Sequence, residues 1–83
     1  MNYRSTKLYK TMTPYLASAY AEGFCEGENA KQEEQLIAWQ WLHDTKIGYS
    51  LQGWYGRTLT ALLEQGIIKD NTTTKTVANL LHG

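Results

Sequence analysis

The apolar residues between positions 30 and 68 recur every three or four residues, which is the spacing of a helix face. No segment shows the strong alternation of apolar and polar residues that a half-buried strand requires. The chain is therefore predicted to be all-α, and two faces carry this prediction. The first face consists of Glu34, Ile37, Ala38, Trp41, Leu42 and Thr45, with Glu34 at its solvated end. The second face consists of Tyr55, Thr58, Leu59, Leu62 and Leu63.

Capping residues indicate where the first two helices begin and end. Thr13 and Pro14 suit the N-cap and the first position of a helix that should end near residue 25. Asn29 and Gln32 have the spacing of a capping box, so a second helix is predicted over residues 30–45. Gly48 can then end this second helix by adopting a left-handed backbone conformation.

The third helix follows the glycine-punctuated segment 48–56 and should end at Gly66, the expected position for a C-terminal glycine. Ile67 and Ile68 can fold back on its last turn, as in a Schellman ending. A short terminal helix could also form around three residues at helical spacing, Val77, Leu80 and Leu81. The predicted fold is a small bundle of three main helices with room for this short fourth one.

A length of 83 residues suffices for one domain and is too short for two, so residues 1–83 are predicted to form a single domain. Residues 1–12 are a basic N-terminal arm, which could be ordered on the domain or loose. Residues 13–68 are the helical core, and residues 69–83 are a polar loop with a short C-terminal segment. The expected core consists of Leu16, Tyr20, Ile37, Trp41, Leu42, Leu51, Tyr55, Leu59, Leu62 and Ile67.

Charge and composition argue against several classes of protein. The net charge is zero, so the general electrostatic footprint of a nucleic-acid-binding protein is missing. The single cysteine cannot form a disulfide framework. No apolar run approaches the roughly 18 residues of a membrane span, and we see no apolar leader segment. These features favour a reducing cytoplasm and no membrane partner.

No group of residues has the spacing of a catalytic, cofactor or metal site, so we expect a protein that is not an enzyme. Cys25 would need a base beside it to act as a nucleophile, and the sequence does not bring His43 or Asp44 near it. His43 and His82 lie in unrelated contexts, and His43 is interpreted as a surface residue of a helix. We interpret four carboxylates as solvated helix surface, namely Glu33, Glu34, Asp44 and Glu64.

The aromatic residues suggest an interaction surface. Trp39 and Trp41 lie about 200° apart on a helix, so they cannot both face one core. Either one of them is core and the other half-covers the surface, or one is an exposed anchor, since Trp, Tyr and Arg are enriched at protein interfaces. The same pair could form an apolar patch suited to a homodimer. The predicted partner-binding residues are Trp39, Tyr49, Trp54 and Arg57.

Arg57 leaves several roles open. It could form a bidentate pair with Asp44 or a glutamate, stack on an aromatic ring, or contact a partner.

A second hypothesis is a nucleic-acid-associated accessory protein of the helix-turn-helix type. The second and third predicted helices have the required order, and the basic arm would contribute Arg4, Lys7 and Lys10. The presumed recognition helix, however, holds Arg57 as its only basic residue and also carries Glu64. Nucleic acid is therefore not the expected partner.

Four short motifs follow one another: AYAEG at residues 19–23, LHDT at 42–45, LQGWYGRT at 51–58 and LLEQG at 62–66. On these motifs, residues 19–68 resemble a family of small uncharacterised proteins encoded by tailed bacteriophages. The octet LQGWYGRT is the most specific of the four. After Thr45, Lys46 and Ile47 displace the glycine that this family usually carries there.

The resemblance brings no activity or cofactor with it, but it implies a setting. It implies a small phage protein in the cytoplasm of the bacterial host. In that setting we expect an interaction module that binds and modulates a host or phage protein, in host takeover or in anti-defence.

Overall fold

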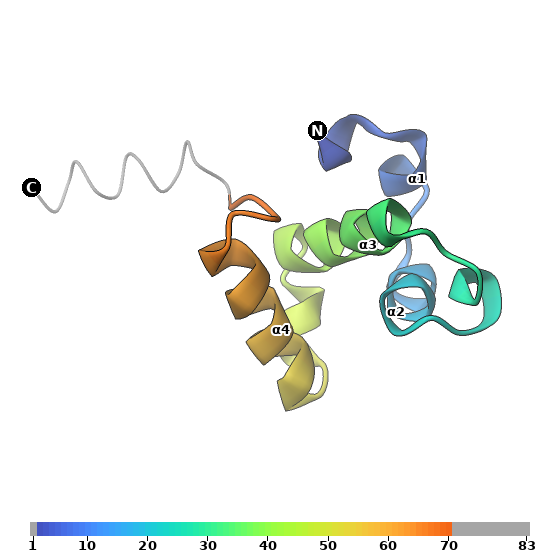
Figure 1. The fold of residues 1–83 in the computed structure, drawn as a ribbon. Helices are drawn as coiled ribbons and strands as arrows, with labels where there is room; N and C mark the ends of the chain where they lie inside the picture. The colour runs from blue at the N-terminus through green and yellow to red at the C-terminus, as the bar shows by residue number, and fades with distance from the viewer. Residues whose placement is uncertain (1, 71–83) are drawn as a thin grey trace, which may run out of the picture.

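The computed structural model describes residues 2–70, and Figure 1 shows its ribbon. This part of the chain contains helices and no strand, which confirms the all-α prediction. The four α-helices are α1 (Lys7–Lys10), α2 (Pro14–Glu22), α3 (Gln32–Asp44) and α4 (Gly53–Glu64). The three 3-10 helices are η1 (Tyr3–Ser5), η2 (Cys25–Gly27) and η3 (Ile47–Ser50). The terminal helix expected around Val77 lies outside the described residues.

The helix α3 lies at the centre of the molecule. In Figure 1, α2 packs below it, the N-terminal arm with η1 and α1 lies above it, and α4 descends from its far end through η3. Because neighbours surround α3, its buried residues are spread around more than one face. This arrangement matches the unusually broad apolar surface of this stretch in the sequence.

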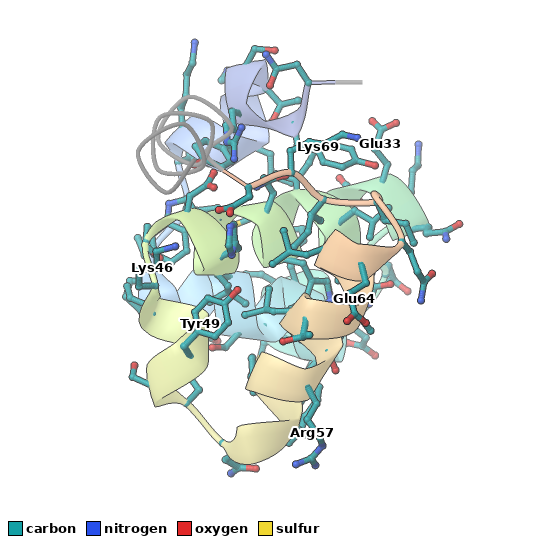
Figure 2. The ribbon with its side chains drawn as sticks, turned by 90° about the vertical axis from the view of Figure 1, so that its left-hand side faces the viewer. Glu33, Lys46, Tyr49, Arg57, Glu64 and Lys69 are labelled. Atoms are coloured by element: carbon teal, nitrogen blue, oxygen red, sulfur yellow. The ribbon has the colours of Figure 1, made fainter. Side chains whose placement is uncertain are left out.

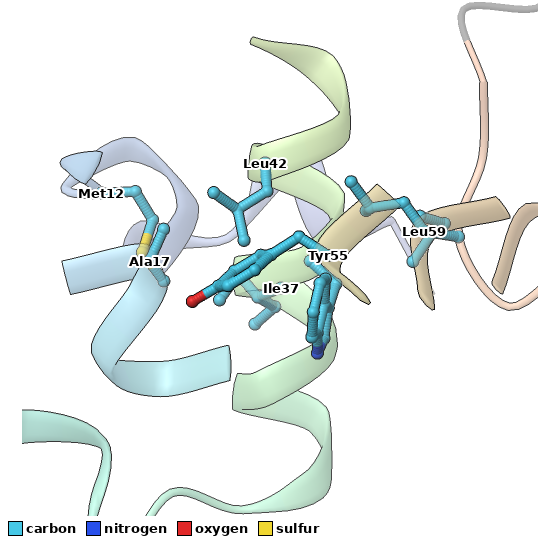
Figure 3. Close-up of a cluster of buried hydrophobic side chains, with 9 residues drawn as sticks. Met12, Ala17, Ile37, Leu42, Tyr55 and Leu59 are labelled. Carbon is cyan, nitrogen blue, oxygen red and sulfur yellow. The ribbon is translucent and has the colours of Figure 1, made fainter. Parts of the chain in front are cut away.

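Figure 3 shows the core, which gathers side chains from α2, α3 and α4 and from the short link before α2. Of the expected core residues, Ile37, Leu42, Tyr55 and Leu59 are buried. Four others are half-buried and pack against this cluster, namely Leu16, Tyr20, Trp41 and Leu62. Met12 and Ala17 are also buried members of this cluster.

Two expected core residues are exposed, so the prediction was wrong for them. Leu51 has an exposed fraction of 38% because it lies in the extended link between η3 and α4. Ile67 has an exposed fraction of 36%, whereas Ile68 is 1% exposed. The chain reverses direction at Gly66, and the reversal turns Ile68 toward the core in place of Ile67.

The start of α2 and the end of α4 confirm the predicted capping, whereas α2 ends at Glu22, earlier than the predicted end near residue 25, with Gly23 as its left-handed C-cap. The Thr13 hydroxyl accepts a hydrogen bond from the Leu16 N–H at the start of α2. After α4, Gly66 has a φ of 73°, the left-handed conformation that glycine adopts without strain. The Gly66 N–H donates to the Leu63 carbonyl at 3.0 Å, and the Ile67 N–H donates to the Leu62 carbonyl at 2.9 Å. These two bonds are a Schellman ending.

Both ends of α3 differ from the prediction. Asn29 is not its cap, because the chain is still turning there, with the Ala30 N–H bonded to the Gly27 carbonyl at 3.0 Å. The helix instead begins after Lys31, whose N–H donates to the Glu34 carboxylate at 2.8 Å.

At the other end of α3, the left-handed residue is Lys46, with a φ of 67°, and not Gly48. Gly48 is needed for its small size. A Cβ atom placed there would lie 2.6 Å from Cδ1 of Leu59 and 3.0 Å from Cβ of Leu42.

Candidate functional site

Three polar side chains on the last turns of α3 form what we call the α3 polar cluster: Gln40, His43 and Asp44. They are spaced i, i+3 and i+4, so they lie on one side of the helix. Gln40 is 2% exposed and His43 is 4% exposed, which is rare for such side chains unless they are hydrogen-bonded. Among the described residues, no buried side-chain nitrogen or oxygen lacks a hydrogen-bond partner.

Asp44 binds the N-terminal arm. Arg4 donates from Nε to Oδ2 at 2.7 Å and from Nη2 to Oδ1 at 2.8 Å, which is a bidentate ion pair. Tyr9 donates its hydroxyl to Oδ2 of the same carboxylate at 2.6 Å. The arm is therefore ordered on the domain, and Arg4, rather than Arg57, is the partner of Asp44.

The pKa values around Asp44 reflect this arrangement. Burial alone would raise the pKa of Asp44, but the hydrogen bonds from Arg4 and Tyr9 and the charge of Arg4 bring it below its ordinary value. The hydrogen bond to Asp44 raises the pKa of Arg4. Burial, together with the bond to Asp44, raises the pKa of Tyr9 to about 12. Arg4 and Asp44 are thus charged, and Tyr9 protonated, at neutral pH.

Gln40 binds the other end of the described chain. Its Nε2 donates to the Lys69 carbonyl at 2.6 Å, and its Oε1 accepts from the Lys69 N–H at 2.7 Å. Arg4 also donates to the Lys69 carbonyl, at 2.6 Å. Both ends of the described chain therefore meet on α3.

His43 is buried, so its interpretation as a surface residue was wrong. Its Nδ1 lies 2.6 Å from the hydroxyl of Tyr49, and its Nε2 lies 2.8 Å from Oδ1 of Asp70. A carboxylate only accepts hydrogen bonds, so in a neutral imidazole Nε2 carries the proton and Nδ1 accepts from Tyr49. Burial, followed by the charges of Asp70 and Asp44, raises the pKa of Tyr49. A protonated phenol suits a hydrogen-bond donor rather than a nucleophile.

A second feature lies between η3 and α4, and we call it the α4 depression. It is open to solvent, has a volume of about 470 Å³ and is mostly apolar. The ring of Tyr49 borders it from η3, and Figure 2 shows Tyr49, Arg57 and Glu64 around this region. One face of α4 forms the rest of its lining: Gly53, Gly56, Arg57, Thr60, Ala61 and Glu64.

The structure brings two of the four predicted partner-binding residues together. Tyr49 and Arg57 both line the α4 depression, and both are exposed. The hydroxyl of Tyr49 is held by His43, and Lys46 places its Nζ 5.9 Å from the centre of the Tyr49 ring. Within residues 2–70, Arg57 forms no ion pair, so of the three roles left open for it, pairing with Asp44 or a glutamate is not seen in this part of the chain.

The two predicted tryptophans lie elsewhere. Trp39 is only 7% exposed and Trp41 is half-buried, so the alternative with one core tryptophan and one that half-covers the surface is the one observed. The choice of Trp39 as an exposed contact was wrong, and Trp39 cannot form the apolar homodimer patch with Trp41. The ring centre of Trp54 lies 5.9 Å from that of Trp39 and 4.3 Å from that of Tyr55. Trp54 is half-buried and joins α4 to α3 with part of its ring accessible. Trp39 is therefore a core residue.

Cys25 stays apart from the other candidates that the structure describes. Cys25 is exposed in η2, away from the α3 polar cluster, and has a φ of 47°. Over residues 2–70, no group of three potential metal-ligating side chains comes together. His82 lies outside the described residues.

Sequence reasoning missed the α3 polar cluster. Its one signal in the sequence is the placement of Gln40 and His43 within an otherwise apolar stretch, which indicates buried polar groups with partners. The partners themselves lie 35 and 40 residues away for Tyr9 and Arg4, and no local pattern identifies them.

The comparisons with known proteins add no relative: the chain matches no protein-family model, no curated protein and no solved structure. Within residues 2–70, no helix has both the length and the apolar character needed to cross a bilayer.

Proposed function

We propose that the chain is a small phage-encoded protein-interaction module that binds and modulates a host or phage protein in the bacterial cytoplasm. Its contact surface comprises Tyr49 and Arg57 at the α4 depression, together with the part of Trp54 that stays accessible elsewhere on α4. The proposal rests mainly on one observation. The guanidinium of Arg57 is exposed beside an exposed tyrosine and forms no ion pair with any described residue.

The chemistry of this surface suits a protein partner. Arginine and tyrosine are enriched among the residues that contribute most to binding, because each combines a large contact area with directional hydrogen bonds. Tyr49 is held in place by its bond to His43, so little side-chain entropy is lost when it is buried at an interface. The phage setting is supported by the resemblance carried by the LQGWYGRT octet, in which Trp54 and Arg57 both lie.

The nucleic-acid alternative loses support from the placement of Arg4. The charge of Arg4 is neutralised by Asp44 in a bidentate pair, so the basic arm offers only Lys7 and Lys10 to a phosphate backbone. We therefore retain the protein-interaction module as the single proposal.

The test is affinity capture from bacterial lysate followed by mass spectrometry, using the full chain and its Arg57→Ala and Trp54→Ala variants. A true partner should be recovered by the parent chain and depleted roughly tenfold or more by Arg57→Ala, the effect expected for a residue that dominates an interface. Lys10→Ala is the matched control, because Lys10 is an exposed base on α1, outside the proposed contact surface.

Circular dichroism of each variant separates loss of binding from loss of folding, which matters most for the half-buried Trp54. If every captured protein is retained equally by Arg57→Ala and Lys10→Ala, the proposed contact surface is wrong.

A further inference from the structure

Two opposite charges lie on the same face of α4. Arg57 and Glu64 both line the α4 depression and are both exposed. They are seven residues apart, which is about two helical turns or roughly 10 Å along the axis. Figure 2 shows Arg57 near one end of α4 and Glu64 toward the other. Within residues 2–70, neither side chain forms an ion pair.

The side chains between and beside these two charges are short, so this part of the α4 surface does not protrude. Thr60 and Ala61 lie midway between them, and Gly56 lies one residue before Arg57. Such short side chains allow a second helix to approach α4 near the lower end of the usual 8–10 Å range of interaxial distance. The α4 depression therefore has a shape that can accept a second helix packed against α4.

The order of the charges specifies which helix fits. A helix lying antiparallel on α4 must carry an acid opposite Arg57 and a base opposite Glu64, seven residues apart and separated by small residues. The helix α4 itself has this pattern. A two-fold axis passing between Thr60 and Ala61 places Arg57 against Glu64 of the partner subunit, and places Glu64 against Arg57 of the partner subunit.

We propose that the α4 depression binds the α4 helix of a second copy of this chain, giving an antiparallel and symmetric homodimer. The contact is isologous, so each charge pair forms twice and the assembly closes at two subunits. The net charge of the chain is zero, and so no overall repulsion opposes the approach of two copies. This surface replaces the tryptophan patch suggested by the sequence, which Trp39 cannot form because it is buried.

The homodimer does not rest on the proposed function. It would cover Arg57 and part of Tyr49, so a protein that binds at these residues would compete with the second copy. A chain held as a dimer would then release its contact surface only on dilution or in exchange for a partner.

A charge swap tests the proposal. Sedimentation equilibrium on the full chain at low salt, over a wide range of concentration, gives the dimer dissociation constant for the parent and for Arg57→Glu, Glu64→Arg and the double variant. Each single change sets like charges opposite each other twice, so the dissociation constant should rise at least roughly tenfold. The double variant exchanges the two charges and should restore the parent value. High salt should narrow all of these differences, because exposed ion pairs are screened.

Two further variants complete the design. Thr60→Trp places a bulky side chain at the crossing point and should weaken the dimer, although Thr60 is exposed and the fold should tolerate the change. Lys10→Glu changes net charge as Arg57→Glu does, but it lies on α1 and should leave the dissociation constant unchanged.

A parent chain that stays monomeric at every concentration would overturn the proposal. A dimer that neither Arg57→Glu nor Glu64→Arg weakens would also overturn it, as would a double variant no better than the single ones. These outcomes test self-association alone. Binding of a different protein through Arg57 is tested separately by affinity capture.

Discussion

At the scale of single residues, two glycines eight positions apart have opposite roles. Gly48 is buried, and its missing side chain lets η3 approach Leu42 and Leu59. Gly56 lies within α4, where a Cβ atom would be 3.9 Å from Cδ1 of Tyr49, an ordinary contact. The first glycine is therefore required by packing, whereas the second weakens a helix without any steric need in the monomer.

Replacing each of these glycines with alanine should change the free energy of unfolding in opposite directions. Gly48→Ala should lower the free energy of unfolding by about 1–3 kcal/mol, because the new methyl group would overpack a filled site. Gly56→Ala should raise it by about 0.5–1 kcal/mol, because alanine favours a helix interior. Urea unfolding followed by circular dichroism measures both. Equal effects of the two substitutions would contradict this account of Gly48.

At the scale of elements, α3 is distinctive because it buries polar as well as apolar residues. Its apolar side chains contact α2 and α4, whereas the α3 polar cluster binds the arm and Lys69. The arm itself is short, and α1 has only four residues, too few to be stable alone. Contacts with α3 must therefore hold it in place.

Removing the charge of Asp44 should release the arm. Asp44→Asn loses the ion pair with Arg4 and weakens the bond from Tyr9, so the free energy of unfolding should fall by about 1–2 kcal/mol. Amide hydrogen exchange should speed up in residues 7–12 much more than in α4, because only the arm loses its anchor. Glu33→Gln, an exposed change on the same helix, is the control and should leave hydrogen exchange in residues 7–12 unchanged. Exchange in the arm as slow as in the parent would show that apolar contacts alone hold it.

At the scale of the whole molecule, the α3 polar cluster joins the two ends of the described chain through the ion pair between Arg4 and Asp44 and the bonds to Lys69. A charged carboxylate at the centre of this junction makes the stability of the molecule depend on pH. The pKa of Asp44 lies below its ordinary value of 3.8, so the folded state favours the ionised form.

The sign of the pH dependence follows from that shift. The contribution of Asp44 to stability is fully present above about pH 4 and is lost as the pH falls through the lower pKa of the folded state. Urea unfolding from neutral to strongly acidic pH should show the difference between the parent and Asp44→Asn shrinking below about pH 4. A difference that stays constant into strong acid would mean that the carboxylate charge does not stabilise the fold.

Local patterns predicted the helical class, the start of α2 and the Schellman ending of α4, because each depends on residues within one or two turns of each other. They placed the cap of α3 two residues early, because the chain is still turning at Asn29. They placed the left-handed residue two residues late, because the tertiary contacts of Gly48 outweigh its local preference. Of the predicted partner-binding residues, Tyr49 and Arg57 both line the α4 depression, whereas Trp39 is buried and cannot contact a partner.

In residues 33–68, some structural features follow from local sequence patterns and others depend on tertiary contacts. Apolar spacing and capping residues are enough to predict two amphipathic helices with a glycine-punctuated link, since both act over a few residues. Tertiary contacts, by contrast, settle that Arg4 and not Arg57 pairs with Asp44, that His43 is buried, and that Arg57 remains exposed on the same face of α4 as Glu64. Those outcomes depend on which distant residues fold onto α3, and no local preference encodes that choice.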